Sequence, residues 1–152
     1  MSLYEKVEKG GEEIVFVYTI CSNREEARTM GFLAIEEKLA ISIDYWVINS
    51  IYPWQGFIKE IDQYILMFST QMNKSSELMK HIEAKHSYKI PMIVRLETNL
   101  TNIPYSLWVD DTLKNSEKYY PNTISYLPEI SFSRTVPKVL VYYRKKMPLL
   151  LA

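Results

Sequence analysis

The chain has 152 residues with 18 basic and 18 acidic side chains, and 47% of its residues are hydrophobic. This length and apolar content are typical of one folded domain and exclude an intrinsically disordered chain. The formal charge of zero removes any general attraction to nucleic acids or acidic membranes, so we expect neither as a partner.

Cysteine use and the N-terminal sequence predict the compartment. The single Cys21 cannot form an intrachain disulfide, which is typical of a reducing environment. The first residues are charged and lack the apolar segment of a signal peptide. Apolar runs such as residues 64–68 are far shorter than the roughly 20 residues needed to span a bilayer. We therefore expect a cytoplasmic protein.

The first predicted elements are a strand, a turn and a helix. Residues 14–20 form a continuous apolar run rich in β-branched side chains, which favours a strand buried on both faces. Ser22 or Asn23 can cap the helix that follows, because Glu25 and Glu26 stand at capping-box spacing. Apolar residues at helical spacing then predict a helix that continues toward Leu39.

Two long alternating segments predict a hairpin of unusual length. Residues 41–52 and 57–70 form its arms, and residues 53–56 form a turn in which Gly56 takes a positive φ. A typical strand has roughly five or six residues, so each arm is unusually long. We therefore expect the hairpin to project beyond the core, with edges that another chain can cover by pairing.

The remaining elements complete a known arrangement. Asn73 and Ser75 are the candidate caps of a second helix, whose apolar positions continue to His86. A strand at residues 92–96 and a final helix at residues 103–113 follow. The order β-α-β-β-α-β with a terminal helix predicts an α+β, ferredoxin-like sandwich with a long projecting hairpin.

Charge changes sign near residue 114. Residues 1–113 hold 11 basic and 16 acidic side chains, whereas residues 114–152 hold 7 and 2. The second segment also contains four of the seven prolines and five of the twelve tyrosines. We predict a domain at 1–113 and a basic, Pro/Tyr-rich C-terminal extension at 114–152. Opposite charge and aromatic burial favour packing of this extension on the same or a neighbouring subunit.

Five collinear segments between residues 13 and 113 carry a family resemblance. They read VYTICSNREEA from Val17, EKLA from Glu37, SIYPWQG from Ser50, HSYKIP from His86 and YSLWV from Tyr105. Together they resemble the CutA divalent-cation-tolerance family. The resemblance implies a ferredoxin-like subunit in a homotrimer whose long hairpins pair between subunits, as in the similar PII signal proteins. It also implies a non-enzymatic role in tolerance of copper and other divalent metals.

Cys21 and His86 are the candidate metal ligands. Cys21 precedes a helix N-terminus, where the helix dipole can lower the pKa of a thiol and favour the thiolate. His86 matches the histidine of the family segment, but Lys89 and Met92 stand where that segment has carboxylates. A hard divalent cation would lose oxygen ligands there, whereas copper(I) tolerates sulfur. We expect any binding of copper or another divalent cation to be weak. His81 lies five positions from His86 and off its helical face.

The resemblance also predicts a ligand cleft between subunits. Its candidate residues are Tyr52, Trp54, Ser69, Tyr88, Lys89 and Trp108. The aromatic members can equally pack in the core or between subunits. Three functions stay open: the metal-tolerance trimer, a PII-like module that binds a small metabolite or a partner protein in the cleft, and an enzyme with a Cys21 nucleophile. The neighbouring Asp110 and Asp111 are expected on a solvated helix face, and the basic run 144–146 is not expected to bind nucleic acid.

Overall fold

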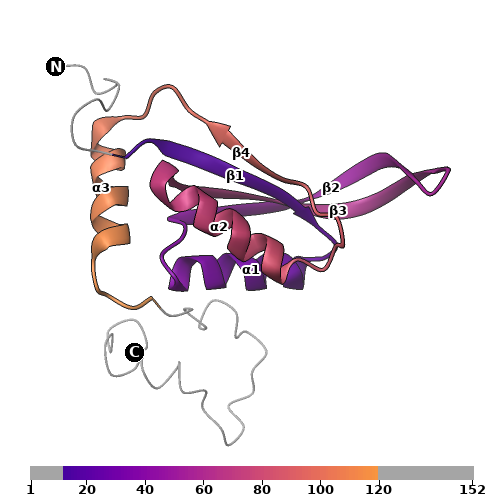
Figure 1. Ribbon diagram of the computed structural model, residues 1–152, viewed down its shortest axis with the longest axis horizontal. Helices are drawn as coiled ribbons and strands as arrows, with labels where there is room; N and C mark the ends of the chain where they lie inside the picture. The colour runs from indigo at the N-terminus through magenta and orange to yellow at the C-terminus, as the bar shows by residue number, and fades with distance from the viewer. Residues whose placement is uncertain (1–11, 120–152) are drawn as a thin grey trace, which may run out of the picture. The chain divides into compact units, whose positions relative to one another are not determined.

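A computed structural model describes residues 12–119. The elements are β1 (Ile14–Cys21), α1 (Arg24–Glu36), β2 (Ser42–Trp54), β3 (Phe57–Gln71), α2 (Met72–Lys85), β4 (Ile93–Glu97) and α3 (Ile103–Lys114). This order confirms the predicted α+β, ferredoxin-like arrangement with a terminal helix (Figure 1).

The four strands form one antiparallel sheet in the order β2-β3-β1-β4. The central strand β1 pairs with β3 from Ile14↔Gln71 to Cys21↔Tyr64, and it pairs with the shorter β4 on its other side. Strands β2 and β4 are therefore the two edges of the sheet in this subunit. Their outer backbone groups have no strand beside them within residues 12–119.

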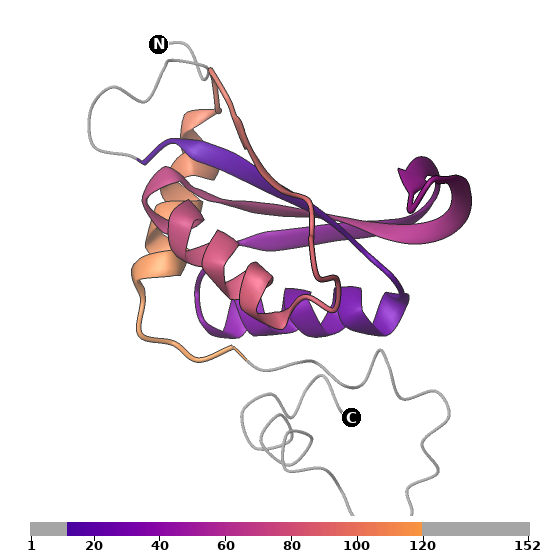
Figure 2. The ribbon, with the colours of Figure 1, turned by 45° about the vertical axis from the view of Figure 1, so that its right-hand side comes forward.

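Helices α1 and α2 lie on one face of the sheet (Figures 1 and 2). The core that they enclose contains Val17, Cys21, Ala27, Met30, Ala34, Leu39, Ala40, Leu66, Phe68, Leu78 and Ile82. On the opposite face, which we call the open face, Phe16, Tyr18 and Ile20 of β1 are only half-buried. The prediction that β1 is buried on both faces is therefore wrong for one subunit, because only one sheet face carries α1 and α2.

Helix α3 covers one end of the open face. Its buried residues Val109 and Leu113 pack against Ile14 at the start of β1, with Ile41 and Tyr105 beside them. In Figure 1, α3 lies across the end of the sheet opposite the projecting hairpin. The rest of the open face has no helix over it in the described part of the chain.

The hairpin of β2 and β3 has an unbroken register from Ser42↔Ser69 to Trp54↔Phe57. Its outer part extends past α1 and α2, as predicted (Figures 1 and 2). The turn is shorter than predicted, because Pro53 and Trp54 still belong to β2. Gln55 has a φ of 51° and Gly56 a φ of 81°, which is the type I′ geometry of a two-residue hairpin.

Helix α1 has the predicted start and an earlier end. Asn23 is its N-cap, and the side-chain oxygen accepts a hydrogen bond of 2.9 Å from the Glu26 N–H. The helix ends at Glu36 rather than at Leu39, because Lys38 takes a left-handed φ of 57°. The Leu39 N–H then bonds to the Ala34 carbonyl, which is the Schellman termination.

The predicted caps of α2 are wrong. Asn73 and Ser75 lie inside the helix, which starts at Met72 with Gln71 as its N-cap residue. The Gln71 side chain does not cap the helix, because its amide donates to Asp110 on α3 at 3.0 Å. The Met72 N–H instead donates to the backbone carbonyl of Glu13. Contacts from distant residues thus replace the local cap that the sequence predicts.

The predicted boundary at residue 114 coincides with the last residue of α3, Lys114. Described residues up to Glu117 belong to one compact unit. Most of the predicted extension, from residue 120 onward, lies outside the described residues together with its basic run 144–146. Its packing on the same or a neighbouring subunit stays a prediction.

Candidate functional site

The ring of His86 is held at the end of β1 by hydrogen bonds to both nitrogens. Its Nε2 lies 2.9 Å from the Ile20 carbonyl oxygen and 3.2 Å from the Thr19 hydroxyl. The Thr19 hydroxyl donates its own proton to the Met92 carbonyl, so its oxygen can only accept from the ring. The Nδ1 atom accepts from the Tyr88 N–H at 3.1 Å. These partners fix the neutral tautomer with the proton on Nε2.

The half-buried carboxylate of Glu26 ties this ring to α1. Glu26 accepts hydrogen bonds from the hydroxyl groups of Ser22 and Ser87 at 2.9 and 2.8 Å, and its Oε1 lies 3.7 Å from His86 Nδ1. Burial alone would raise the pKa of Glu26, but the hydrogen bonds from Ser87 and Ser22 outweigh it, so the pKa lies below its usual value. Glu26 is therefore an ionised acceptor that joins the start of α1 to the segment after α2.

Cys21 is buried beside this network and stays a thiol. Its Sγ–H donates weakly to the Asn23 carbonyl at 3.5 Å. Burial, and then the negative charge of Glu26, raise the pKa of Cys21 to about 11. The expected lowering of this pKa at the N-terminus of α1 is therefore wrong, because loss of solvent outweighs the helix dipole.

The donor chemistry does not fit a preformed metal site. Cys21 holds its proton, and both ring nitrogens of His86 already have partners in the protein. Within residues 12–119 no group of three or more His, Cys, Asp and Glu side chains is placed to hold a metal ion. His81 lies apart from His86, with its Nδ1 3.6 Å from the Glu37 carboxylate. The Cys21–His86 metal site stays a prediction without geometric support in one subunit.

Part of the predicted ligand cleft gathers where the hairpin leaves the sheet. The Tyr88 hydroxyl donates to Gln63 Oε1 at 2.7 Å, and its ring lies 5.1 Å from the His86 ring. Burial and then the nearby Tyr52 raise the pKa of Tyr88. Tyr52 and Tyr88 are thus brought together, and the exposed Lys89 follows Tyr88 directly in the chain.

The other cleft residues lie elsewhere. Ser69 is buried at the opposite end of the hairpin, where its hydroxyl and that of Ser42 bond to the Tyr105 oxygen. Trp108 lies beside Tyr105, with 5.9 Å between ring centroids. Ser42 and Tyr52 are ten positions apart on β2, a separation of about 33 Å along an extended strand. One subunit therefore holds two separate groups, and a single cleft between subunits stays a prediction.

The structure also places Trp54 and the neighbouring Asp110 and Asp111. Trp54 lies at the hairpin tip, paired with Phe57. Asp111 is exposed, as predicted, but Asp110 is not simply solvated. Its carboxylate accepts from Lys114 at 2.8 Å and from Gln71 at 3.0 Å, and these bonds lower its pKa. Asp110 thus holds α3 against the end of β3.

Sequence reasoning missed three residues of these two groups: Glu26, Gln63 and Tyr105. Glu26 was visible as a capping-box residue, but its bond to Ser87 joins positions 61 apart in the chain. Gln63 was not distinguished from the other polar residues of its arm, such as Lys59 and Asp62, and Tyr105 was noted only as part of the segment YSLWV. No helix within residues 12–119 is long and apolar enough to cross a membrane.

Comparison with known proteins identifies the family. The model of the CutA1 divalent ion tolerance protein family matches residues 15–112. The divalent-cation tolerance protein CutA of Thermococcus kodakarensis is 31% identical over 97 residues, which cover 64% of this chain and 93% of that protein. The CutA homolog of Xenopus laevis is 32% identical over 95 residues, which cover 62% of this chain and 63% of that protein.

Solved structures give the same result. The periplasmic divalent cation tolerance protein CutA of Archaeoglobus fulgidus is similar with a TM-score of 0.64 and 26% identity, over 66% of this chain and 99% of that one. CutA1 of Oryza sativa is similar with a TM-score of 0.65 and 25% identity, over 70% and 98%. The family match spans nearly all of the described fold, from β1 to α3. The chain belongs to the CutA1 divalent ion tolerance protein family.

Proposed function

We propose that the chain works as a non-enzymatic homotrimer in the tolerance of divalent metal ions. Family membership supports the metal-tolerance role. The observation that carries the assembly is the open face, whose apolar side chains are exposed in one subunit. The exposed apolar residues on this face are Trp46, Trp54, Phe57, Met92, Val94 and Leu96. The other face of the hairpin also exposes apolar side chains, those of Val47, Ile51 and Ile58.

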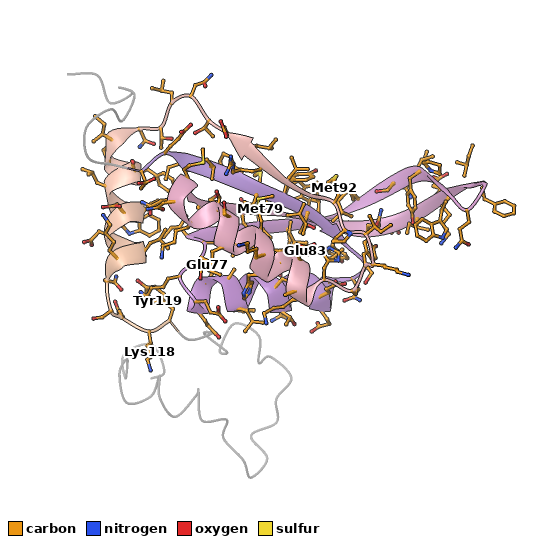
Figure 3. The ribbon with its side chains drawn as sticks, in the orientation of Figure 1. Glu77, Met79, Glu83, Met92, Lys118 and Tyr119 are labelled. Carbon is orange, nitrogen blue, oxygen red and sulfur yellow. The ribbon has the colours of Figure 1, made fainter. Side chains whose placement is uncertain are left out.

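A second copy of the chain is the partner that fits this face. Phe57 is 75% exposed although it lies in a fifteen-residue strand, and an apolar surface of this kind marks an interaction site. The side chains of the projecting hairpin stand free of α1 and α2, and Met92 lies at the base of the hairpin (Figure 3). The edges β2 and β4 also offer backbone groups that another copy can pair with. The family resemblance implies three copies.

The state of Cys21 and His86 supports a non-enzymatic role. A thiol with a pKa of about 11 is almost wholly protonated at neutral pH and is a poor nucleophile. The His86 ring cannot act as its base, since Nδ1 accepts from Tyr88 and Nε2 bonds to Ile20. The closest candidate for an activated nucleophile in the described residues therefore lacks the arrangement that activation requires.

We propose that metal binding by Cys21 and His86 is weak. A cation would have to displace the proton of Cys21 and the bonds that hold His86, each of which lowers affinity. Copper titration of the wild type, Cys21→Ser and His86→Ala tests this directly. Affinity that is unchanged in both variants would remove these residues from any metal site, and tight binding lost in both would contradict weak binding.

The assembly is tested by a charge placed on the open face. Val94→Asp puts a carboxylate among apolar side chains that association would bury, so it should dissociate the oligomer. Light scattering should then give a lower mass for this variant than for the wild type at the same protein concentration. Ser76→Asp on the exposed side of α2 is the control with the same charge change and should leave the mass unchanged. An oligomer as stable in Val94→Asp as in Ser76→Asp would place the interface elsewhere.

A further inference from the structure

The open face of the sheet carries two charged side chains within the four strands. Side chains alternate between the faces, and the registers contain no bulge. The open face therefore receives the even positions of β1, β2 and β4 and the odd positions of β3. Among these positions Asp44 and Lys59 are charged, and the others are apolar, aromatic or uncharged polar.

Asp44 and Lys59 cannot meet within one subunit. Asp44 pairs with Met67, whereas Lys59 pairs with Tyr52, so eight strand positions separate the two charges. This corresponds to about 27 Å along the hairpin. Both side chains are exposed, and within residues 12–119 neither has an ion-pair partner.

Both charges lie among residues that association of two subunits would bury. Asp44 lies near α3, where it adds to the effect of burial in raising the pKa of Tyr105. Lys59 lies on the projecting part of the hairpin, two positions from Phe57. Each charge is thus surrounded by residues of the apolar face that association would remove from water. Burying a charge without a partner costs on the order of several kcal/mol. An interface over this face therefore requires a partner for each of the two charges.

We infer that Asp44 of one subunit pairs with Lys59 of the next subunit in the homo-oligomer. The inference rests on the proposed function and adds a contact that determines how neighbouring subunits are aligned in the oligomer. In a cyclic assembly one part of a surface meets a different part of the neighbouring copy. The hairpin end of one subunit then lies against the α3 end of the next, and every subunit uses Asp44 toward one neighbour and Lys59 toward the other. Complementary charges at opposite ends fix the direction of the ring.

Charge reversal with restoration tests the pairing in the full chain. Asp44→Lys and Lys59→Asp should each raise the concentration at which the oligomer dissociates by at least about tenfold. The double variant should return this concentration to within about threefold of the wild type, since the pair is remade in reverse. Glu60→Lys is the matched control, because it changes the net charge as Asp44→Lys does but lies on the other face of β3.

The outcomes separate this inference from the proposed function. If the wild type is an oligomer and Asp44→Lys dissociates at the same concentration as Glu60→Lys, the pairing is overturned but the proposed assembly is not. A double variant no more stable than the singles would also overturn it. A wild-type chain that stays monomeric would overturn both. If a reversal prevents folding, Asp44→Asn and Lys59→Gln provide the same comparison, with weakening expected in each and none in Glu60→Gln.

Discussion

The carboxylate of Glu26 accepts hydrogen bonds from both the backbone N–H and the hydroxyl of Ser87, at 2.9 and 2.8 Å. These residues belong to the first turn of α1 and to the segment that follows α2. The contact fixes the chain just before Tyr88, whose hydroxyl then reaches Gln63 on β3. The Glu26 carboxylate thus acts together with the bonds of His86 and Tyr88 to hold the segment after α2 at the base of the hairpin.

Replacing Glu26 should destabilise the fold. Glu26→Gln removes a charged acceptor from two serines, and we expect a loss of roughly 1–3 kcal/mol in the free energy of unfolding. Urea unfolding followed by circular dichroism at pH 7 measures this loss. The control is Glu25→Gln, because the Glu25 side chain is 83% exposed and its loss should have almost no effect. Equal stability of the two variants would contradict the role of Glu26.

The contribution of Glu26 should depend on pH. Its pKa is lower in the folded protein than the usual 4.5, so the unfolded chain binds the proton more readily. The stabilisation is therefore present above pH 4.5 and is lost as the pH falls through the folded pKa. The difference in stability between wild type and Glu26→Gln should shrink between pH 6 and pH 3, roughly. A difference that stays constant or grows on acidification would contradict this sign.

Cys21 should resist alkylation while the protein is folded. Its pKa of about 11, against an ordinary 9.0, reduces the thiolate fraction at neutral pH by about a hundredfold, and burial slows access further. Iodoacetamide labelling followed by mass spectrometry should be slow in native buffer and complete in guanidinium chloride. Rapid labelling of the native protein would show a reactive thiol and revive the Cys21 enzyme hypothesis.

The two turn residues of the hairpin should respond to substitution in opposite directions. Gly56→Ala should destabilise by about 1 kcal/mol because a side chain is strained at a φ of 81°, although no atom lies within 4 Å of the added carbon. Gln55→Asn should stabilise by a few tenths of a kcal/mol, roughly, since Asn tolerates the positive φ better. Urea midpoints that shift in the same direction would contradict the two-residue turn.

The strands and the start of α1 could be predicted because local patterns decide them. Alternation identified the long arms β2 and β3, and the capping-box spacing limited the cap of α1 to Ser22 or Asn23, of which Asn23 is the cap. The cap of α2 could not be predicted, because Gln71 is drawn to Asp110 on α3. Local propensity is overridden there by a contact between residues 39 positions apart.

The site was less predictable than the fold for the same reason. The pKa of Cys21 follows from burial under α1 and α2, which the dipole argument for one helix end does not include. Ser69 and Tyr52 lie at opposite ends of the hairpin in one subunit, so the predicted cleft needs residues from two subunits and stays a prediction. The register of the hairpin follows from the two-residue turn at Gln55 and Gly56.

Sedimentation equilibrium of the full wild-type chain, over micromolar concentrations, tests the central claim most directly. If the open face and the hairpin are surfaces for other copies, the measured mass should be three times that of one chain and independent of concentration. A mass of one chain throughout this range would contradict the account, because the exposed apolar residues of the open face, Trp46 and Leu96 among them, would then face water.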